Sequence, residues 1–156
     1  MRTFQTMNPM ADKKYDQCRA CCIEQLSNGI MLYGNAKQAH WNVKGVNALD
    51  THRFFDEIAE MLLKHVDTLG ERCVQLGGYA MIDPKANQIP ELPGKATNAL
   101  EMTAAIADGL AKYIEMLHGH ITMSGDCGDL VSQNIFLDLS QDAEKMLMFL
   151  EMHLQK

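Results

Sequence analysis

The chain has 156 residues, of which 47% are hydrophobic and 22% are charged, and its formal net charge is −6. This length and hydrophobic content suit one folded domain with a buried core, and they exclude a generally disordered chain. The acidic balance argues against a domain whose main role is to grip nucleic acid, because such domains are usually basic.

The first sixteen residues lack the basic start and the apolar centre of a secretory signal, and no apolar stretch approaches the length of a transmembrane helix. We therefore expect a cytoplasmic protein without a membrane partner. The five cysteines are then expected to be free thiols. The cluster Cys18-x-x-Cys21-Cys22 lies in a helical stretch without a second Cys or His pair at zinc-site spacing, so we interpret it as small buried residues.

Apolar residues recur at helical spacing in four long segments, and no segment shows the alternation of a strand. A flexible segment is expected over residues 1–10, followed by a single domain over 11–156. The first helix is predicted over 11–41. The second is predicted to begin after Asp50, which would be its N-cap, and to end at Gly77-Gly78.

The third helix is predicted to begin at Asn98, with Glu101 three residues later as a capping partner, and to end near Gly125. The fourth is predicted over 129–155. The link over 42–49 is short enough to turn the first helix back on itself. The link over 79–96 is longer and rich in proline, so it can cross from one end of a bundle to the other. The sequence thus predicts an all-α, antiparallel four-helix bundle with a long crossover between helices two and three.

Four potential metal ligands share one face of the second predicted helix. At about 100° per residue, His52, Asp56, Asp67 and Glu71 fall on one stripe about 100° wide. Imidazole and carboxylate are together the ligands expected for iron, with carboxylates favouring the ferric product. A solvated helix face is the alternative interpretation, since carboxylates on helices usually face water.

These ligands cannot all bind one ion within a single subunit. Eleven residues separate Asp56 from Asp67, which is about 16 Å along a helix. Two identical helices packed antiparallel across a two-fold axis would place the His52/Asp56 end of one against the Asp67/Glu71 end of the other, twice over. His40, at the end of the first helix, would complete each site.

Three stretches resemble the signature of the Dps proteins, the mini-ferritins, in both residue types and gaps. They are Ala39-His40-Trp41-Asn42-Val43-Lys44-Gly45, Leu49-x-x-His52-x-x-Phe55-Asp56-Glu57 and Asp67-x-x-x-Glu71-Arg72. The resemblance implies a ferritin-like bundle that assembles into a hollow dodecameric shell. It also implies ferroxidase centres at the two-fold interfaces, which oxidise Fe(II) to Fe(III), with hydrogen peroxide commonly preferred over dioxygen.

In this resemblance, His40, His52 and Asp56 belong to one subunit, and Asp67 and Glu71 to its partner. The iron would be stored as a mineral inside the shell, which would protect DNA from oxidative damage. Trp41 is implied to lie near the centre and to quench stray oxidising equivalents, with packing at the dimer interface as its alternative role. One departure is Gly70, where the family tends to carry a better helix former.

Three questions stay open at this point. DNA binding is expected to be weak or absent, because the first fourteen residues offer only Arg2, Lys13 and Lys14, so association with the nucleoid is a secondary alternative. A second alternative is a shell that has kept the fold and lost the ferroxidase chemistry. The five intact ligands argue against it. Glu115-x-x-His118 is the element of di-iron sites inside larger bundles, but it occurs once. Asp126 and Asp129 are candidates for lining an iron entry pore.

Overall fold

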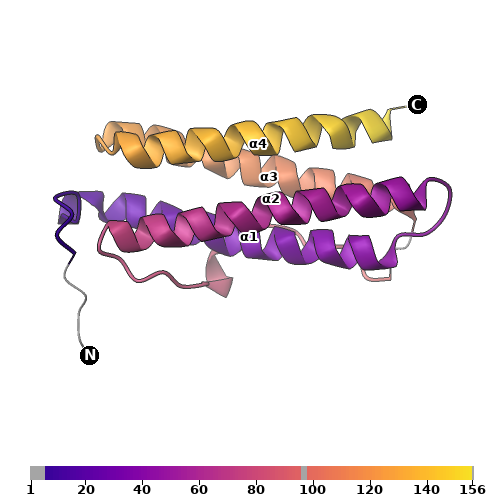
Figure 1. The fold of residues 1–156 in the computed structure, drawn as a ribbon, viewed down its shortest axis with the longest axis horizontal. Helices are drawn as coiled ribbons and strands as arrows, with labels where there is room; N and C mark the ends of the chain where they lie inside the picture. The colour runs from indigo at the N-terminus through magenta and orange to yellow at the C-terminus, as the bar shows by residue number, and fades with distance from the viewer. Residues whose placement is uncertain (1–5, 96–97, 156) are drawn as a thin grey trace.

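The computed structural model describes residues 6–95 and 98–155, and this part of the chain contains four long helices that lie side by side (Figure 1). The helices are α1 (Asp16–Asn42), α2 (Ala48–Gln75), α3 (Ala99–Asp126) and α4 (Leu130–Leu154), and two short 3-10 helices are η1 (Lys13–Tyr15) and η2 (Pro84–Ala86). The predicted all-α bundle is confirmed. None of the described helices carries a stretch both long and apolar enough to cross a membrane.

The bundle consists of two helical hairpins. Helices α1 and α2 form one hairpin, α3 and α4 form the other, and α1 packs against α3 between them. Figure 1 shows the link between α2 and α3 running along the bundle from one end to the other, with η2 within it. The predicted crossover is therefore confirmed, although Ala96, which ends the predicted link, lies outside the described residues. Residues 1–5 of the predicted flexible segment and residue 156 of the predicted domain lie outside them as well.

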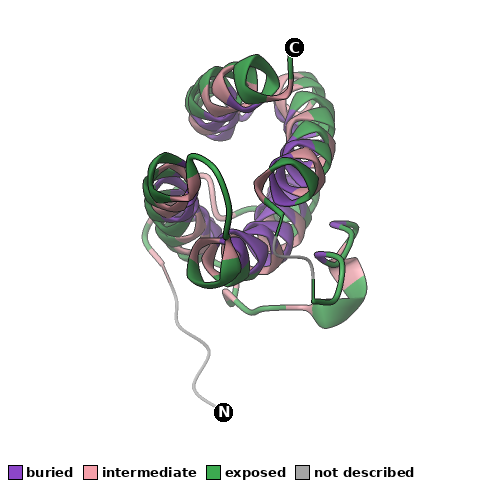
Figure 2. Cartoon of the chain, turned by 90° about the vertical axis from the view of Figure 1, so that its right-hand side faces the viewer, coloured by how far each residue is buried: buried purple, intermediate pink, exposed green. Residues whose placement is uncertain are grey.

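The core lies between the hairpins, on the sides of the helices that face one another (Figure 2). Its largest fully buried side chains include Tyr113, Phe55 and Phe136, and burying such a side chain contributes about 1.5–3 kcal/mol. Two glycines explain the close approach of the helices around α1. A Cβ on Gly109 of α3 would lie 2.8 Å from a methyl of Leu32, and one on Gly29 would lie 3.0 Å from Val66.

Two helix starts differ from the prediction. Residues 13–15 form η1, which Asp12 caps, so α1 begins at Asp16 rather than at residue 11. Helix α2 begins at Ala48 rather than after Asp50. Asn47 adopts a left-handed conformation with φ of 61°, and its carbonyl accepts the Thr51 N–H at 3.1 Å. The first turn therefore begins before Asp50 and includes it, and the negative charge of the Asp50 carboxylate interacts favourably with the helix dipole there.

The other two helix starts follow the prediction. The Asn98 side chain accepts the backbone N–H groups of Leu100 at 2.9 Å and Glu101 at 3.3 Å. Asp129 caps α4 by accepting the N–H of Ser132 at 3.0 Å. These caps satisfy N–H groups that have no partner inside the helix.

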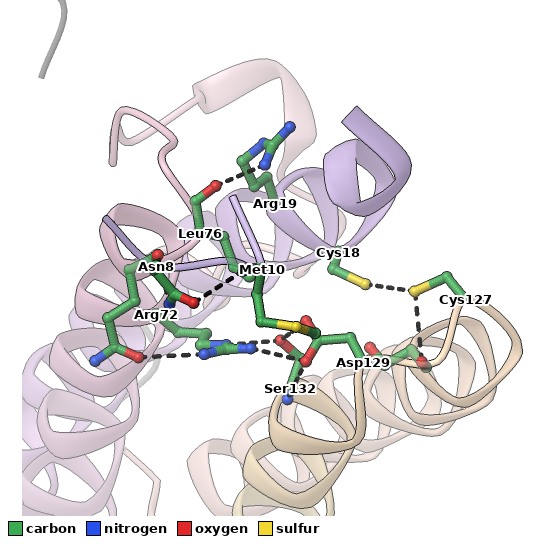
Figure 3. Close-up of polar contacts among 11 residues, drawn as sticks. Asn8, Met10, Cys18, Arg19, Arg72, Leu76, Cys127, Asp129 and Ser132 are labelled. Atoms are coloured by element: carbon green, nitrogen blue, oxygen red, sulfur yellow. Dashed lines mark hydrogen bonds and ion pairs between the residues drawn. The ribbon is translucent and has the colours of Figure 1, made fainter. Parts of the chain in front are cut away.

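Asp129 also joins a buried polar cluster that ties α2 to the start of α4 (Figure 3). Its carboxylate accepts from the Arg72 guanidinium at 2.7 Å and from the Ser132 hydroxyl at 2.6 Å, and Arg72 Nε donates to the same hydroxyl at 2.8 Å. Asp129 is fully buried, so the suggestion that it lines an iron entry pore is wrong. An acidic helix start is visible in the sequence, but the arginine that neutralises it is not.

Candidate metal centre

The turn between α1 and α2 brings two of the predicted ligands together. His40 lies in the last turn of α1, and His52 lies in the first turns of α2. Because the two helices are antiparallel and the link between them is short, the two imidazole rings stack, with their centroids 3.7 Å apart and their planes 21° from parallel. Both residues are partly buried.

Each of these rings is held by the backbone of the other residue. The Nδ1–H of His40 donates to the carbonyl oxygen of His52 at 2.8 Å, and the Nδ1–H of His52 donates to the carbonyl oxygen of His40 at 2.6 Å. A neutral ring that donates from Nδ1 has its lone pair on Nε2, which is the form that binds a metal. The exchange therefore fixes the tautomer and the orientation of both rings, as partners of metal-bound histidines commonly do.

Asp56 lies beside this pair, one turn after His52 on α2. Its Oδ1 is 4.0 Å from Nδ1 of His40 and 2.6 Å from Nζ of Lys37 on α1. The hydrogen bond from Lys37 is the largest influence on the pKa of Asp56 and lowers it, and nearby His40 acts in the same direction. The carboxylate is therefore ionised at neutral pH and available as a ligand, but a metal ion must compete with the lysine for it.

Lys37 was not singled out from the sequence. It precedes His40 by three residues on α1, which places the two side chains on the same face of the helix. That spacing is the signal that could have identified it. Trp41 follows His40 and is 70% exposed, and Lys37 Nζ lies 6.0 Å from the centre of its ring. Trp41 is therefore no part of the core of the subunit.

The second ligand pair lies farther along α2. Asp67 and Glu71 are both exposed and line a shallow surface depression with Val66, Gly70 and Val74. Helix α2 continues without interruption through Gly70. Among the described residues of the single chain, no three His, Cys, Asp or Glu side chains are grouped closely enough to hold a metal ion. The structure makes His40, His52 and Asp56 neighbours without arranging them as a three-ligand site in the single chain, and it leaves Asp67 and Glu71 apart from them.

The single E-x-x-H motif does not form a site inside the bundle. Glu115 and His118 are both exposed, and His118 Nε2 lies 2.9 Å from a carboxylate oxygen of Glu144, which is also exposed. This pair sits on the outer surface of the α3–α4 hairpin. The single E-x-x-H motif therefore does not support the alternative of an enzyme with a di-iron site inside its own bundle.

Comparison with known proteins identifies the family of this fold. The model of the ferritin-like domain matches residues 23–156. The DNA protection during starvation protein of Agrobacterium fabrum is 31% identical over 160 residues, which cover 100% of this chain and 99% of the relative. The chain belongs to the Dps family of ferritin-like proteins.

Solved Dps structures share the fold over almost the whole chain. Dps from Thermosynechococcus elongatus superposes with a TM-score of 0.87 at 23% identity, covering 94% of this chain and 95% of that one. Dps from Vibrio cholerae, described as a member of a broad superfamily of ferritin-like diiron-carboxylate proteins, superposes with a TM-score of 0.86 at 23% identity and covers 91% of each chain. The resemblance to Dps proteins predicted from the three sequence stretches is confirmed.

Proposed function

We propose that the protein is a ferroxidase and an iron store, which oxidises Fe(II) to Fe(III) at sites shared between two subunits. His40, His52 and Asp56 of one subunit would form each site with Asp67 and Glu71 of its partner. The observation that carries this proposal is the exchange of hydrogen bonds between His40 and His52, which orients both imidazole rings next to the ionised carboxylate of Asp56. The Dps family in general implies iron storage and ferroxidase-type chemistry, which supports the same conclusion.

The surface around the second ligand pair supports an interface there. Large apolar side chains of α2 are exposed beside these ligands: Leu63, which lines a depression with Asp67, is 52% exposed, and Val74, which lines one with Asp67 and Glu71, is 41% exposed. A group of exposed apolar residues next to polar ligands is typical of a surface that another subunit covers. In a two-fold dimer with α2 antiparallel to its partner, this surface lies opposite the histidine end of the other α2. We propose that such dimers assemble into a hollow dodecamer.

The ligand set suits both oxidation states of the substrate. Imidazole nitrogens help to hold Fe(II), and the three carboxylates stabilise the charge of Fe(III). We propose hydrogen peroxide as the oxidant in preference to dioxygen. Two Fe(II) ions then supply the two electrons that reduce one peroxide to two waters, with two protons taken up. Hydroxyl radicals are not released, so iron storage in the shell also protects DNA in the cytoplasm.

Two further roles follow from positions near this site. Trp41 is exposed beside His40, so we propose that it lies at the dimer interface and intercepts oxidising equivalents that escape the iron. DNA binding is proposed to be weak or absent. In the described part of the N-terminal segment, the cations Lys13 and Lys14 belong to η1, which Asp12 caps with its own negative charge.

The proposal is tested by anaerobic loading with Fe(II) followed by hydrogen peroxide. We expect the double variant His52→Ala/Asp56→Ala to form a shell of normal size by size exclusion and to oxidise iron at least roughly tenfold more slowly. The matched control is His118→Ala/Glu144→Ala, which removes an exposed histidine–carboxylate pair elsewhere on the surface and should oxidise iron at the normal rate. Equal rates in all three proteins would show that the stripe on α2 is a solvated helix face.

A further inference from the structure

Two thiols from distant parts of the sequence meet at the end of the bundle that holds the α3–α4 turn. Cys18 lies in the first turn of α1, and Cys127 follows the last residue of α3. Their sulfur atoms are 2.8 Å apart, and Figure 3 shows them pointing toward each other. Both are free thiols in this structure. Because an S–S bond is about 2.05 Å long, small side-chain rotations are enough to bring the two sulfurs to bonding distance.

Only one of the five cysteines combines a close thiol partner with access to solvent. Cys127 is partly exposed, whereas Cys18, Cys21, Cys22 and Cys73 are buried. Burial and the hydrogen bond with Cys127 raise the pKa of Cys18 to about 12, and burial raises the pKa of Cys21 to about 11. The buried thiols therefore remain protonated, and the thiolate is the reactive form of cysteine. An oxidant that arrives from solvent meets Cys127 first.

We propose that Cys18 and Cys127 form a thiol–disulfide couple that a hydroperoxide oxidises within one subunit. Cys127 acts as the attacking thiol and Cys18 as the resolving thiol. The assignment rests on the separation of the two sulfurs and on the exposure of one of them. It does not depend on the proposed ferroxidase site, because neither cysteine contacts a proposed iron ligand.

The reaction balances with hydrogen peroxide as the oxidant. The sulfur of Cys127 attacks one peroxide oxygen, the O–O bond breaks, and the products are a sulfenic acid and one water. The sulfur of Cys18 then attacks the Cys127 sulfur, the S–O bond breaks, and the departing hydroxide takes the Cys18 proton to form a second water. In total, two thiols lose two electrons and two protons, and one peroxide is reduced to two waters.

The disulfide would join the two hairpins of the bundle. In the reduced protein the crossover between α2 and α3 is the covalent connection between them, and the new bond would add a second one that links residues 109 positions apart. Met10 and Tyr15 pack against the same pair, so the bond would form inside a small apolar cluster. Cross-linking residues so far apart restricts the unfolded chain strongly, and we expect the melting temperature to rise by roughly 5–15 °C.

The test uses the reduced, full-length protein in the presence of an iron chelator. One equivalent of hydrogen peroxide per subunit is added, free thiols are alkylated under denaturing conditions, and the peptides are identified by mass spectrometry. We expect a cross-linked peptide pair that contains Cys18 and Cys127, and a melting temperature that rises on oxidation and falls again on reduction. Cys127→Ser should give neither, and Cys73→Ala, which removes a buried thiol, should give both.

Two results would overturn the proposal. One is the accumulation of sulfinic acid on Cys127 while Cys18 remains fully alkylated. The other is a cross-link between different cysteines or between subunits. Since iron is absent throughout, a failure of the ferroxidase proposal leaves the outcome of this experiment unchanged.

Discussion

The buried pair of Arg72 and Asp129 gives a sharp prediction for stability. In the variant Arg72→Met, the fully buried carboxylate of Asp129 loses the guanidinium at 2.7 Å and keeps only its hydrogen bonds from Ser132. Breaking a buried ion pair by removing one partner costs about 3–5 kcal/mol, because it leaves an uncompensated buried charge. For a chain of this size, such a loss lowers the melting temperature by roughly 10 °C.

The assay is chemical unfolding followed by circular dichroism, at one fixed subunit concentration because assembly contributes to apparent stability. Arg53→Met is the matched control, since Arg53 is an exposed arginine on the same helix, and its effect should stay within about 0.5 kcal/mol. Ser132→Ala should fall between the two, at about 1–3 kcal/mol, because it removes the hydroxyl shared by the ion pair. If Arg72→Met proves as stable as Arg53→Met, the reasoning about the buried pair is refuted.

Three other predictions concern the iron ligands and the pH dependence of stability. Lys37→Met frees Asp56 from its ion pair, so we expect Fe(II) to bind about 2–5-fold more tightly in anaerobic titrations, and weaker binding would contradict the competition. Burial raises the pKa of Asp129, but the hydrogen bonds from Ser132 and the charge of Arg72 lower it by more. Its stabilisation is therefore present above about pH 4 and lost as pH falls through the lowered folded-state pKa, and Asp129→Asn should flatten acid unfolding in that range. Burial also lowers the pKa of His120; stability should then fall as pH drops below about 6.5, and the difference in urea midpoint between about pH 7.5 and about pH 5.5 should shrink in His120→Gln.

Local patterns in the sequence predicted most of the fold, because the hydrophobic spacing of each helix reflects the face that it buries. The cap at Asn98 was also readable, since a capping side chain acts within three residues, and the start of α4 at Asp129 was placed correctly. The start of α2 was not readable, because the left-handed conformation of Asn47 starts the helix before Asp50, the polar residue that looked like its cap.

Contacts between distant residues explain what the sequence could not show. The stripe on α2 predicted which side chains share a face, but the exchange between His40 and His52 depends on the shape of the turn that joins their helices. Asp129 looked like an exposed acidic residue because Arg72, which neutralises it, lies 57 positions away. The meeting of Cys18 with Cys127 depends in the same way on how the two hairpins pack.

If each iron site takes ligands from two subunits, two inactive variants that lack opposite halves of the site should restore activity when they are mixed. His52→Ala/Asp56→Ala removes one half of every site, and Asp67→Ala/Glu71→Ala removes the other half. If the two proteins are dissociated and reassembled together in equal amounts, half of the dimers are mixed, and each mixed dimer regains one complete site of its two. Iron oxidation should then recover to about a quarter of the wild-type rate. A mixed assembly that stays as inactive as either variant alone would contradict it.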